Sequence, residues 1–406
     1  MKIKLKDFLE KALVVNLSIL IIFAPFSKRP VKVAFVIAVL IWLALKILEF
    51  RSQFYKYLIP HTPLNKPFFF FLSALIFSTV FSLDFFHSQS VFFERYLFYF
   101  LLFFIAIYAV KNEKNSFILA GACIAASLII CIGMIWDPLH VPVKWCWHTC
   151  FGRCLNLAPY LVLYTPLSCA IVLLARNKFL KISGSVSFLL ALLCLIMHGS
   201  RGAWIAVLMT LLVVFFVIIR NNKEKSYRGL VLSLIFILFF AGLVLSKSSL
   251  LQYRASLIFS PGRWDRLDLW KATFRIFKDH PVLGAGIGMH EKLFNDYAPP
   301  GGFAGGVTYH LHGHNTYLEI ASESGIIGFL AFIWLCSVFL INAMKSMSMR
   351  READITAIHL AFIGSVLATL IAGLSGTCMI VGVQDAAVFW VLFGMAAGMI
   401  PVLEKI

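Results

Sequence analysis

Hydrophobic residues occur along the chain in long runs that short clusters of charged and polar residues separate. A bilayer core about 30 Å thick is spanned by roughly 20 apolar residues of α-helix, and runs of about this length recur along the sequence. The pattern predicts about twelve membrane-spanning helices. The predicted spans are residues 12–26, 33–49, 67–84, 96–110, 115–136, 158–175, 182–198, 202–219, 229–246, 319–343, 355–375 and 379–401.

The composition and the first run both support a membrane protein. Hydrophobic residues make up 61% of the 406 residues and charged residues only 14%, which leaves too little polar surface to cover a soluble globule of this size. The first run follows a basic N-terminus, as in a signal peptide, but it ends in APFSKRP without a small-residue cleavage site. We therefore interpret this run as a retained helix and expect an all-α, polytopic membrane protein.

The Lys and Arg residues indicate how the spans are oriented. With the N-terminus in the cytoplasm, the cytoplasmic loops hold most of these residues, as the positive-inside rule requires. The short loops on the opposite side hold only Lys28, Arg29, Lys32, Arg95, Lys144, Arg153 and Arg201. Both termini are then cytoplasmic. The formal net charge of +17 reflects loops that face anionic lipid, and no motif in the sequence indicates nucleic acid as a partner.

The predicted spans divide the chain into three parts. Residues 1–245 form transmembrane helices 1–9, residues 246–316 form one large hydrophilic loop outside the cytoplasm, and residues 317–406 form transmembrane helices 10–12. Because so many of the informative polar residues lie in the loop, we expect the chemistry of the protein to lie there as well.

The large loop contains a predicted amphipathic helix. A turn at Pro261 and Gly262 precedes it, and we expect the helix to lie on the membrane surface and to end at His280 and Pro281. The glycine-rich VLGAGIG follows as a flexible connection. The apolar residues with helical spacing are Leu267, Trp270, Phe274 and Phe277.

Four charged side chains are candidates for binding an anion or a polar substrate. Arg263 and Arg266 lie near the N-terminus of the amphipathic helix, where free N–H groups and the helix dipole favour a diphosphate. Contact with lipid headgroups is the alternative. Arg201, between two apolar spans, is interpreted as anion-binding, with snorkelling to headgroups as its alternative. Asp385, within the last span, either orients an arginine or a substrate hydroxyl or forms a salt bridge between helices.

Three histidines are gathered in the segment YHLHGHNTYLEIASESGIIG, directly before an apolar helix. Imidazole suits a general base at His314, because its ordinary pKa of about 6.5 matches proton abstraction near neutral pH. Alternating histidines can instead ligate a metal when the segment is extended. We expect no metal, because no cluster of carboxylates completes the set and Gly313 indicates a turn. His310 and His312 then position the loop.

The cysteines fall into two groups. Six of the nine lie in or at the edge of apolar spans and are interpreted as small core residues. The other three, Cys146, Cys150 and Cys154, lie in a loop outside the cytoplasm. Two of them can form a disulfide if the loop supplies suitable geometry, and a metal site with His148 is the alternative. The sequence leaves this question open.

A longer pattern follows the histidines. His314 and Asn315 are followed by the nine residues TYLEIASES, then by Gly325, two residues and Gly328. This run resembles a motif of the O-antigen ligase family, in which His-Asn, nine positions and Gly-x-x-Gly recur at the end of the large periplasmic loop. The upstream RLDLWKATFRIFKDHPVLGAG, the SRGAW at residues 200–204 and the layout of the spans are also similar. FGRCLNLAPYL resembles a stretch before the sixth span in the wider superfamily, with its cysteines as a departure.

The resemblance implies a glycosyltransferase with a GT-C-like architecture in the bacterial inner membrane and an active site that faces the periplasm. The implied donor is a glycan on undecaprenyl diphosphate, and the implied acceptor is a hydroxyl of the lipid A-core oligosaccharide. The implied catalytic residues are His314, Arg201 and Arg266. The residues expected to bind the substrates are Asn315, Arg263, His312, Asp385 and Arg153.

The chemical logic of the residues agrees with that implication. Attack of a hydroxyl on an anomeric carbon requires a base for its proton and cationic stabilisation of the departing diphosphate. His314 can supply the first, and Arg201 and Arg266 the second. Because guanidinium groups hold the leaving diphosphate, we expect an inverting transfer that requires no metal and no cofactor.

Two alternatives within the superfamily stay open, namely an O-antigen polymerase and a protein O-oligosaccharyltransferase. The chain length and the complete His-Asn and Gly-x-x-Gly spacing favour the ligase, and no extended soluble C-terminal domain of the kind found in many protein-directed enzymes is evident in the sequence. A transporter of lipid-linked sugars is a third alternative. Transporters place their charged residues near the membrane midplane within broken helices, whereas here most of the informative polar residues lie in the loop.

Overall fold

The computed structural model describes residues 2–49, 60–136, 142–143, 146–148, 154–155, 157–198, 200–221, 265–297, 312–347 and 352–400. Helices account for nearly all of the regular structure in these ranges. The prediction of helical spans is confirmed, but the all-α expectation misses one small antiparallel sheet in the cysteine-rich loop. Its three strands, in spatial order, are β1 (Pro142–Val143), β2 (Cys146–His148) and β3 (Cys154–Leu155).

The chain divides into two compact units, each of which we describe by itself. The first unit comprises residues 1–122, 264–346 and 373–406, and the second comprises residues 123–263 and 347–372. The helices of the first unit are α1 (Lys2–Phe23), α2 (Lys28–Glu49), α4 (Asn65–Val80), α5 (Phe85–Val91), the π-helix η1 (Phe92–Leu97), α6 (Phe98–Ala109), α13 (Asp265–Asp279), α14 (Met289–Leu293), α15 (Thr316–Met347) and α17 (Val383–Gly398).

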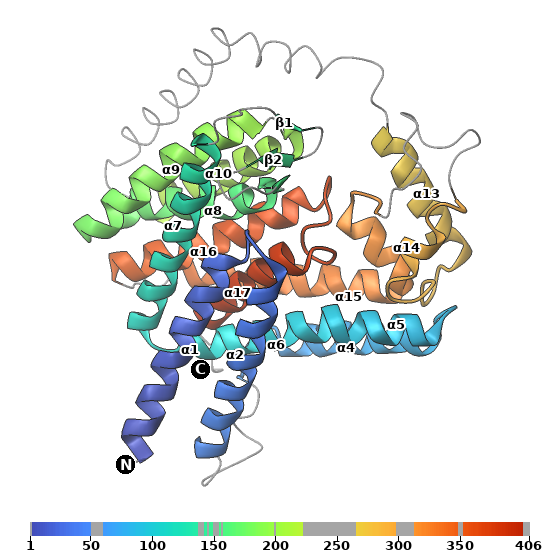
Figure 1. Cartoon of the computed structure of the whole chain (residues 1–406), viewed down its shortest axis with the longest axis horizontal. Coiled ribbons are helices and arrows are strands. Elements are labelled where there is room, and N and C mark those ends of the chain that lie inside the picture. The colour runs from blue at the N-terminus through green and yellow to red at the C-terminus, as the bar shows by residue number, and fades with distance from the viewer. Residues whose placement is uncertain are drawn as a thin grey trace, which may run out of the picture. The chain divides into compact units, whose positions relative to one another are not determined.

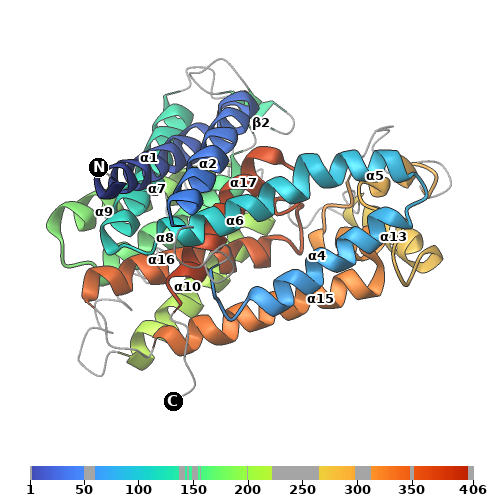
Figure 2. The same cartoon turned by 90° about the horizontal axis from the view of Figure 1, so that it is seen from below.

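Aromatic side chains form the centre of the first unit. Trp390 of α17 is fully buried, and its ring lies 5.4 Å from that of Phe100 and 6.2 Å from that of Phe103, both of α6. Phe68 of α4 packs against the same tryptophan at 6.3 Å. Three helices that are distant in the sequence are therefore held together by burial of large apolar surfaces. Figures 1 and 2 show α4 running alongside α15, with α13 and α14 beside the first part of α15.

The second unit is a bundle of helices with a polar seam. Its helices are α8 (Ala158–Leu174), α9 (Lys178–His198), α10 (Arg201–Asn221), α16 (Ala353–Ala372) and most of α7 (Glu113–Ile135). Ser187 of α9 lies at the centre of the seam, where its hydroxyl is 2.8 Å from that of Ser168 and 2.9 Å from that of Ser127. Ser365 of α16 donates to the carbonyl of Leu163 at 2.7 Å. Such hydrogen bonds join helices whose surfaces are otherwise apolar.

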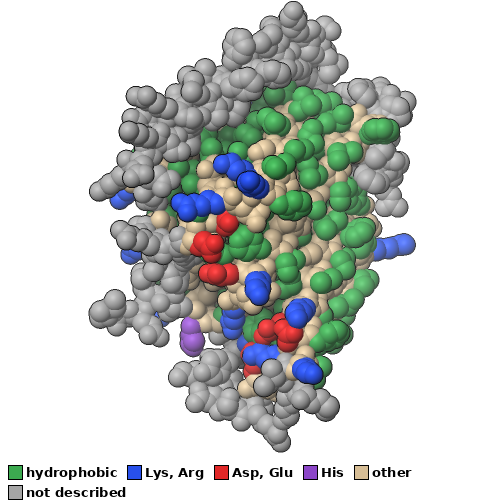
Figure 3. Space-filling model, turned by 90° about the vertical axis from the view of Figure 1, so that its left-hand side faces the viewer, with side chains coloured by type: hydrophobic (Ala, Val, Ile, Leu, Met, Phe, Trp, Pro, Cys, Tyr) green, Lys and Arg blue, Asp and Glu red, His purple; other side chains and the backbone are tan. Residues whose placement is uncertain are grey.

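Seven of the described helices are long and apolar enough to cross a membrane. Three shorter apolar helices also coincide with predicted spans, namely α4, α8 and α17. The predicted span 229–246 lies outside the described residues, so the total of twelve stays a prediction. Large apolar side chains remain exposed on these helices, among them Leu40 and Ile47 of α2. Figure 3 shows hydrophobic side chains at the surface, as expected where helices contact lipid.

The fourth predicted span begins too late. The prediction starts it at residue 96, whereas helical structure begins at Phe85. The side chain of Asp84 accepts a hydrogen bond from the backbone N–H of His87 at 3.1 Å and so caps α5. The polar residues of the first turns hide this helix in a hydrophobicity pattern, whereas in the structure the cap satisfies one of the backbone N–H groups that the helix N-terminus exposes.

Candidate functional site

The site is built on a small hydrophobic cluster between α13 and α14. Leu269, Ala272 and Ile276 of α13 are buried against Met289 and Phe294. The sequence predicted α13 correctly as an amphipathic helix, and the helix packs on α14 through residues other than the predicted apolar stripe. On that predicted stripe, Leu267 and Phe274 are exposed. The buried stripe carries smaller side chains, because the neighbouring segment approaches closely, and the larger residues stay on the outer side.

The segment that follows α13 is docked, so the prediction of a flexible connection is wrong. Backbone hydrogen bonds fasten it to α15, from Ala285 N–H to Ser322 O at 2.9 Å and from Gly286 N–H to Glu323 O at 3.0 Å. The N–H of Ile326 also donates to Pro281 O at 2.8 Å. Glycine is needed in this segment for a backbone with positive φ rather than for mobility.

The first glycine of the Gly-x-x-Gly motif makes this docking possible. Gly325 adopts φ 65° and ψ −168° within α15 and interrupts the helix there. A Cβ atom at this position would lie only 2.1 Å from Val282 O. The interruption also exposes the carbonyl of Glu323, which accepts a hydrogen bond from the hydroxyl of Ser78 at 2.6 Å. The motif therefore joins α4, α15 and the segment after α13.

The start of α15 is fixed by Asn315. Its Oδ1 accepts the backbone N–H groups of Tyr317 and Leu318 at 3.0 and 3.1 Å, which makes it the N-cap of the helix. Its Nδ2 donates to Leu374 O at 3.2 Å. His314 directly before it has φ 50° and an exposed side chain. The structure thus presents the imidazole of His314 on a rigidly held turn.

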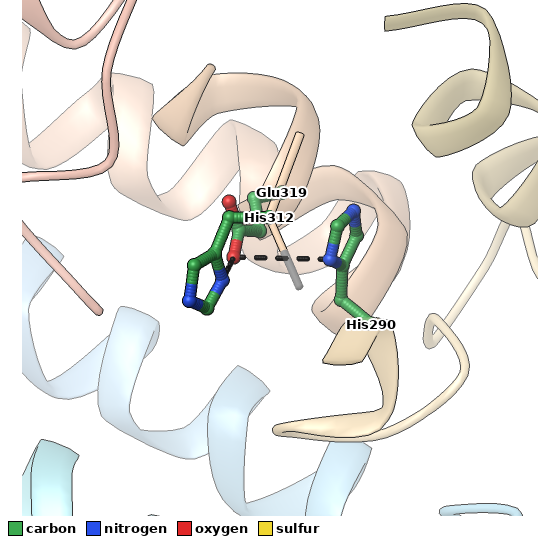
Figure 4. A group of neighbouring side chains, drawn as sticks. All are labelled: His290, His312 and Glu319. Carbon is green, nitrogen blue, oxygen red and sulfur yellow. Dashed lines mark hydrogen bonds and ion pairs between the residues drawn. The ribbon is translucent and has the colours of Figure 1, made fainter. Parts of the chain in front are cut away.

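His312 lies beside a carboxylate that the sequence places seven residues later. Its Nδ1 is 3.3 Å from Glu319 Oε1, and His290 Nδ1 is 3.9 Å from the same oxygen. Figure 4 shows the carboxylate of Glu319 between the two imidazole rings. Glu319 and His290 are both buried, whereas His312 is partly exposed. The spacing of the histidines in the sequence suggested His310, His312 and His314 as alternative metal ligands. The structure brings together a different group that can hold a metal ion, namely His290, His312 and Glu319.

A second carboxylate lies on the other side of His312. Glu291 Oε1 is 3.9 Å from His312 Nε2 and 2.9 Å from the guanidinium of Arg95. Arg95 lies in the π-helix η1. Short π-helical turns are frequent at functional sites. The next residue, Tyr96, donates from its hydroxyl to Glu323 Oε2 at 3.3 Å. In the sequence, Arg95 indicates only the orientation of the spans, and no motif marks Tyr96.

An ion pair closes the outer edge of the cluster. Lys292 Nζ lies 2.7 Å from Asp84 Oδ2. The hydrogen bond from Lys292, together with one from the backbone N–H of His87, lowers the pKa of Asp84. The carboxylate therefore stays ionised at a lower pH than an isolated aspartate, and it links α14 to the start of α5.

The other predicted site residues lie in different surroundings. Arg266 is exposed in the first turn of α13, in the same unit as His314. Arg201 is the first residue of α10 in the second unit and is also exposed. Asp385 folds back over the start of α17, where a Cβ added at Gly382 would lie 1.8 Å from its Oδ1. Arg263, Arg153 and His310 lie outside the described residues.

The helices and this polar cluster define a polytopic membrane protein with a built site where α13, α14 and the start of α15 meet. Residues 186–333 match the family model described as O-antigen ligase, which confirms the resemblance to that family. Its members are glycosyltransferase-like enzymes. The matched segment contains Arg201, Arg266 and His314. No curated protein matches the chain.

Two substitutions at Asn315 test its capping role. Asn315→Ala is expected to lower the free energy of unfolding by roughly 0.5–2 kcal/mol, because the cap is lost. Asn315→Ser keeps an oxygen acceptor for the Tyr317 and Leu318 N–H groups and loses the hydrogen bond to Leu374 O, so it is expected to retain more of the stability than Asn315→Ala. Thermal unfolding of the detergent-solubilised protein measures both. If Asn315→Ser were as unstable as Asn315→Ala, the cap would not be the stabilising interaction.

Proposed function

We propose that this protein is a lipopolysaccharide O-antigen ligase. It transfers a glycan from undecaprenyl diphosphate to a sugar hydroxyl of the lipid A-core oligosaccharide at the periplasmic face of the inner membrane. The observation that carries the proposal is the exposed imidazole of His314 on the turn that Asn315 fixes at the start of α15. The family match over residues 186–333 supports the reaction class.

In this proposal His314 is the general base. It removes the proton of the acceptor hydroxyl as the oxygen attacks the anomeric carbon, and the bond from that carbon to the diphosphate oxygen breaks. Arg201 and Arg266 stabilise the negative charge on the departing undecaprenyl diphosphate. Attack opposite the leaving group inverts the anomeric centre. Because the guanidinium groups carry the charge stabilisation, the step requires no metal on the diphosphate.

The substrate-binding role is assigned to His312 and Asn315 beside this turn and to three residues elsewhere in the chain. His312 lies two residues from His314 with its ring partly exposed, which suits packing of the ring against an acceptor sugar. Arg263, Arg153 and Asp385 are proposed to bind the donor or to orient the acceptor. Asn315 contributes by holding the turn, since its own amide is engaged with the backbone at both ends.

The lipopolysaccharide of cells that lack this gene tests the proposal. For a ligase we expect bare core on a gel, together with accumulation of long glycan on undecaprenyl diphosphate. Core that carries a single repeat unit would instead indicate the polymerase. An unaltered ladder with unaltered lipid-linked glycan would overturn the ligase proposal and leave a protein-directed transferase or a transporter to be tested. Re-expression of the wild-type gene is the control and should restore the ladder.

A further inference from the structure

We propose that His290, His312 and Glu319 form a zinc site that ties the segment before α15 to α14. The three ligand atoms lie within 4.8 Å of one another. Glu319 Oε1 is 3.3 Å from His312 Nδ1 and 3.9 Å from His290 Nδ1, and Figure 4 shows it between the two rings. In a tetrahedral site with bonds of about 2.0–2.1 Å, neighbouring ligand atoms lie roughly 3.4 Å apart. The two distances from Glu319 Oε1 lie within about 0.5 Å of that value, and the two imidazole nitrogens, which lie within 4.8 Å of each other, would approach by up to about 1.4 Å on binding the ion.

Thr273 sets the hydrogen position on His290. The Thr273 hydroxyl donates its single hydrogen to Leu269 O at 2.9 Å, so it acts as an acceptor towards His290 Nε2 at 3.0 Å. Nε2 then carries the ring hydrogen, and the Nδ1 lone pair of the neutral ring is directed to the Glu319 side. A histidine ligand of zinc shows this arrangement, in which the second ring nitrogen donates to a supporting group.

The buried carboxylate of Glu319 calls for a cation. Its residue is 1% exposed, and its Oε2 has no hydrogen-bond partner among the described residues. The 3.9 Å between Glu319 Oε1 and His290 Nδ1 is too long for a hydrogen bond but suits two ligands of one ion. A buried carboxylate that lacks full compensation is costly, and a divalent ion offsets that cost. When zinc takes Nδ1 of a neutral His312, the ring hydrogen is carried by Nε2 instead, so the ring stays neutral.

The residues around the proposed site hold the segment at Gly313 close to α13 and α14. A Cβ at Gly313 would lie 2.3 Å from Thr273 Oγ1 and 3.4 Å from His290 Nε2, so only glycine allows the chain to pass this close. Glu291 Oε1 lies 3.9 Å from His312 Nε2 and can accept its hydrogen once zinc holds Nδ1. Two imidazoles with one carboxylate select zinc over magnesium or calcium, which prefer oxygen ligands. The ion fixes the loop, and it is distinct from the arginines proposed to bind the diphosphate.

Metal content of the purified protein tests the site. The full chain is purified in detergent without a polyhistidine tag, incubated with zinc sulfate, desalted and analysed by elemental mass spectrometry. We expect about one zinc per chain, and at least a tenfold weaker affinity in His290→Ala, since a direct ligand contributes more than the supporting groups whose loss costs roughly 10- to 100-fold. His280→Ala, at the end of α13 and outside the cluster, is the matched control and should keep the metal.

Two further variants keep the test decisive if His290→Ala fails to fold. Glu319→Gln removes the anionic ligand at nearly constant volume, and Thr273→Val removes the acceptor for His290 Nε2. Both should lower the zinc affinity, by more than tenfold for the first and by roughly 10- to 100-fold for the second. Wild-type protein with less than about a tenth of a zinc per chain, or folded variants that retain wild-type affinity, would overturn the site. The outcome does not depend on the proposed transferase activity.

Discussion

Gly325→Ala is expected to lower the free energy of unfolding by about 3 kcal/mol or more. The glycine has φ 65° and ψ −168°, a region that side chains other than glycine rarely occupy and that costs roughly 1–3 kcal/mol. The added Cβ would also lie 2.1 Å from Val282 O and 2.6 Å from Gly284 N. Both contacts are with backbone atoms, so the docked segment must move and its hydrogen bonds to α15 must break.

The matched control is Gly121→Ala in α7. Nothing lies within 4 Å of a Cβ built at this position, and alanine in a helix is favoured over glycine by about 0.5–1 kcal/mol. The same chemical change should therefore be neutral or slightly stabilising at residue 121 and strongly destabilising at residue 325. Thermal unfolding followed by circular dichroism in detergent distinguishes the two. Equal stability of Gly325→Ala and wild type would mean that α15 can straighten without cost.

The membrane spans follow from sequence because their physical requirement is local. A helix that crosses lipid must satisfy its own backbone groups and present apolar side chains over roughly 20 consecutive residues. That signal is complete within each run, and the predicted spans in the described residues coincide with helices. The exception is the start at Phe85, where the cap from Asp84 allows a polar first turn that a hydrophobicity pattern does not register.

The sequence predicts only part of the candidate site, because the rest depends on contacts between residues that are distant in the sequence. His314, Asn315 and Gly325 lie close together along the chain and form one recognisable motif. Arg95 and His290 are distant in sequence, and nothing in their own neighbourhoods indicates that they meet this motif. The packing of α13 on α14 and the π-helix η1 bring them there. Tertiary contacts of this kind have no local sequence signal.

The glycines after α13 illustrate how the same composition supports opposite interpretations. Three glycines in seven residues predict mobility when taken alone. Gly284, Gly286 and Gly288 all have positive φ. Glycine allows these backbone angles, and the segment adopts a single docked conformation with them. Only the partner surface on α15 decides between these interpretations, because its carbonyls at Ser322 and Glu323 receive the segment's N–H groups.

His314→Ala is expected to reduce the rate of glycan transfer by about 10²- to 10⁴-fold, which is the usual contribution of a general base and corresponds to roughly 3–5 kcal/mol in the activation barrier. Folding should be nearly unaffected, because the side chain is exposed and Asn315 keeps the cap. Reconstituted protein with lipid-linked glycan and purified lipid A-core measures the rate. Transfer by His314→Ala at the wild-type rate would exclude His314 from the chemistry.

A second substitution separates a base from an orienting group. Asn tolerates the positive φ of this position, here 50°, and its amide can hydrogen-bond an acceptor hydroxyl but cannot take its proton. If His314 is the base, His314→Asn should be as slow as His314→Ala at every pH. If His314 only orients the acceptor, His314→Asn should recover much of the rate. The comparison is sharp because Asn occupies the left-handed backbone position at low cost, so His314→Asn keeps the turn and differs from the wild type chiefly in lacking a ring that can accept a proton.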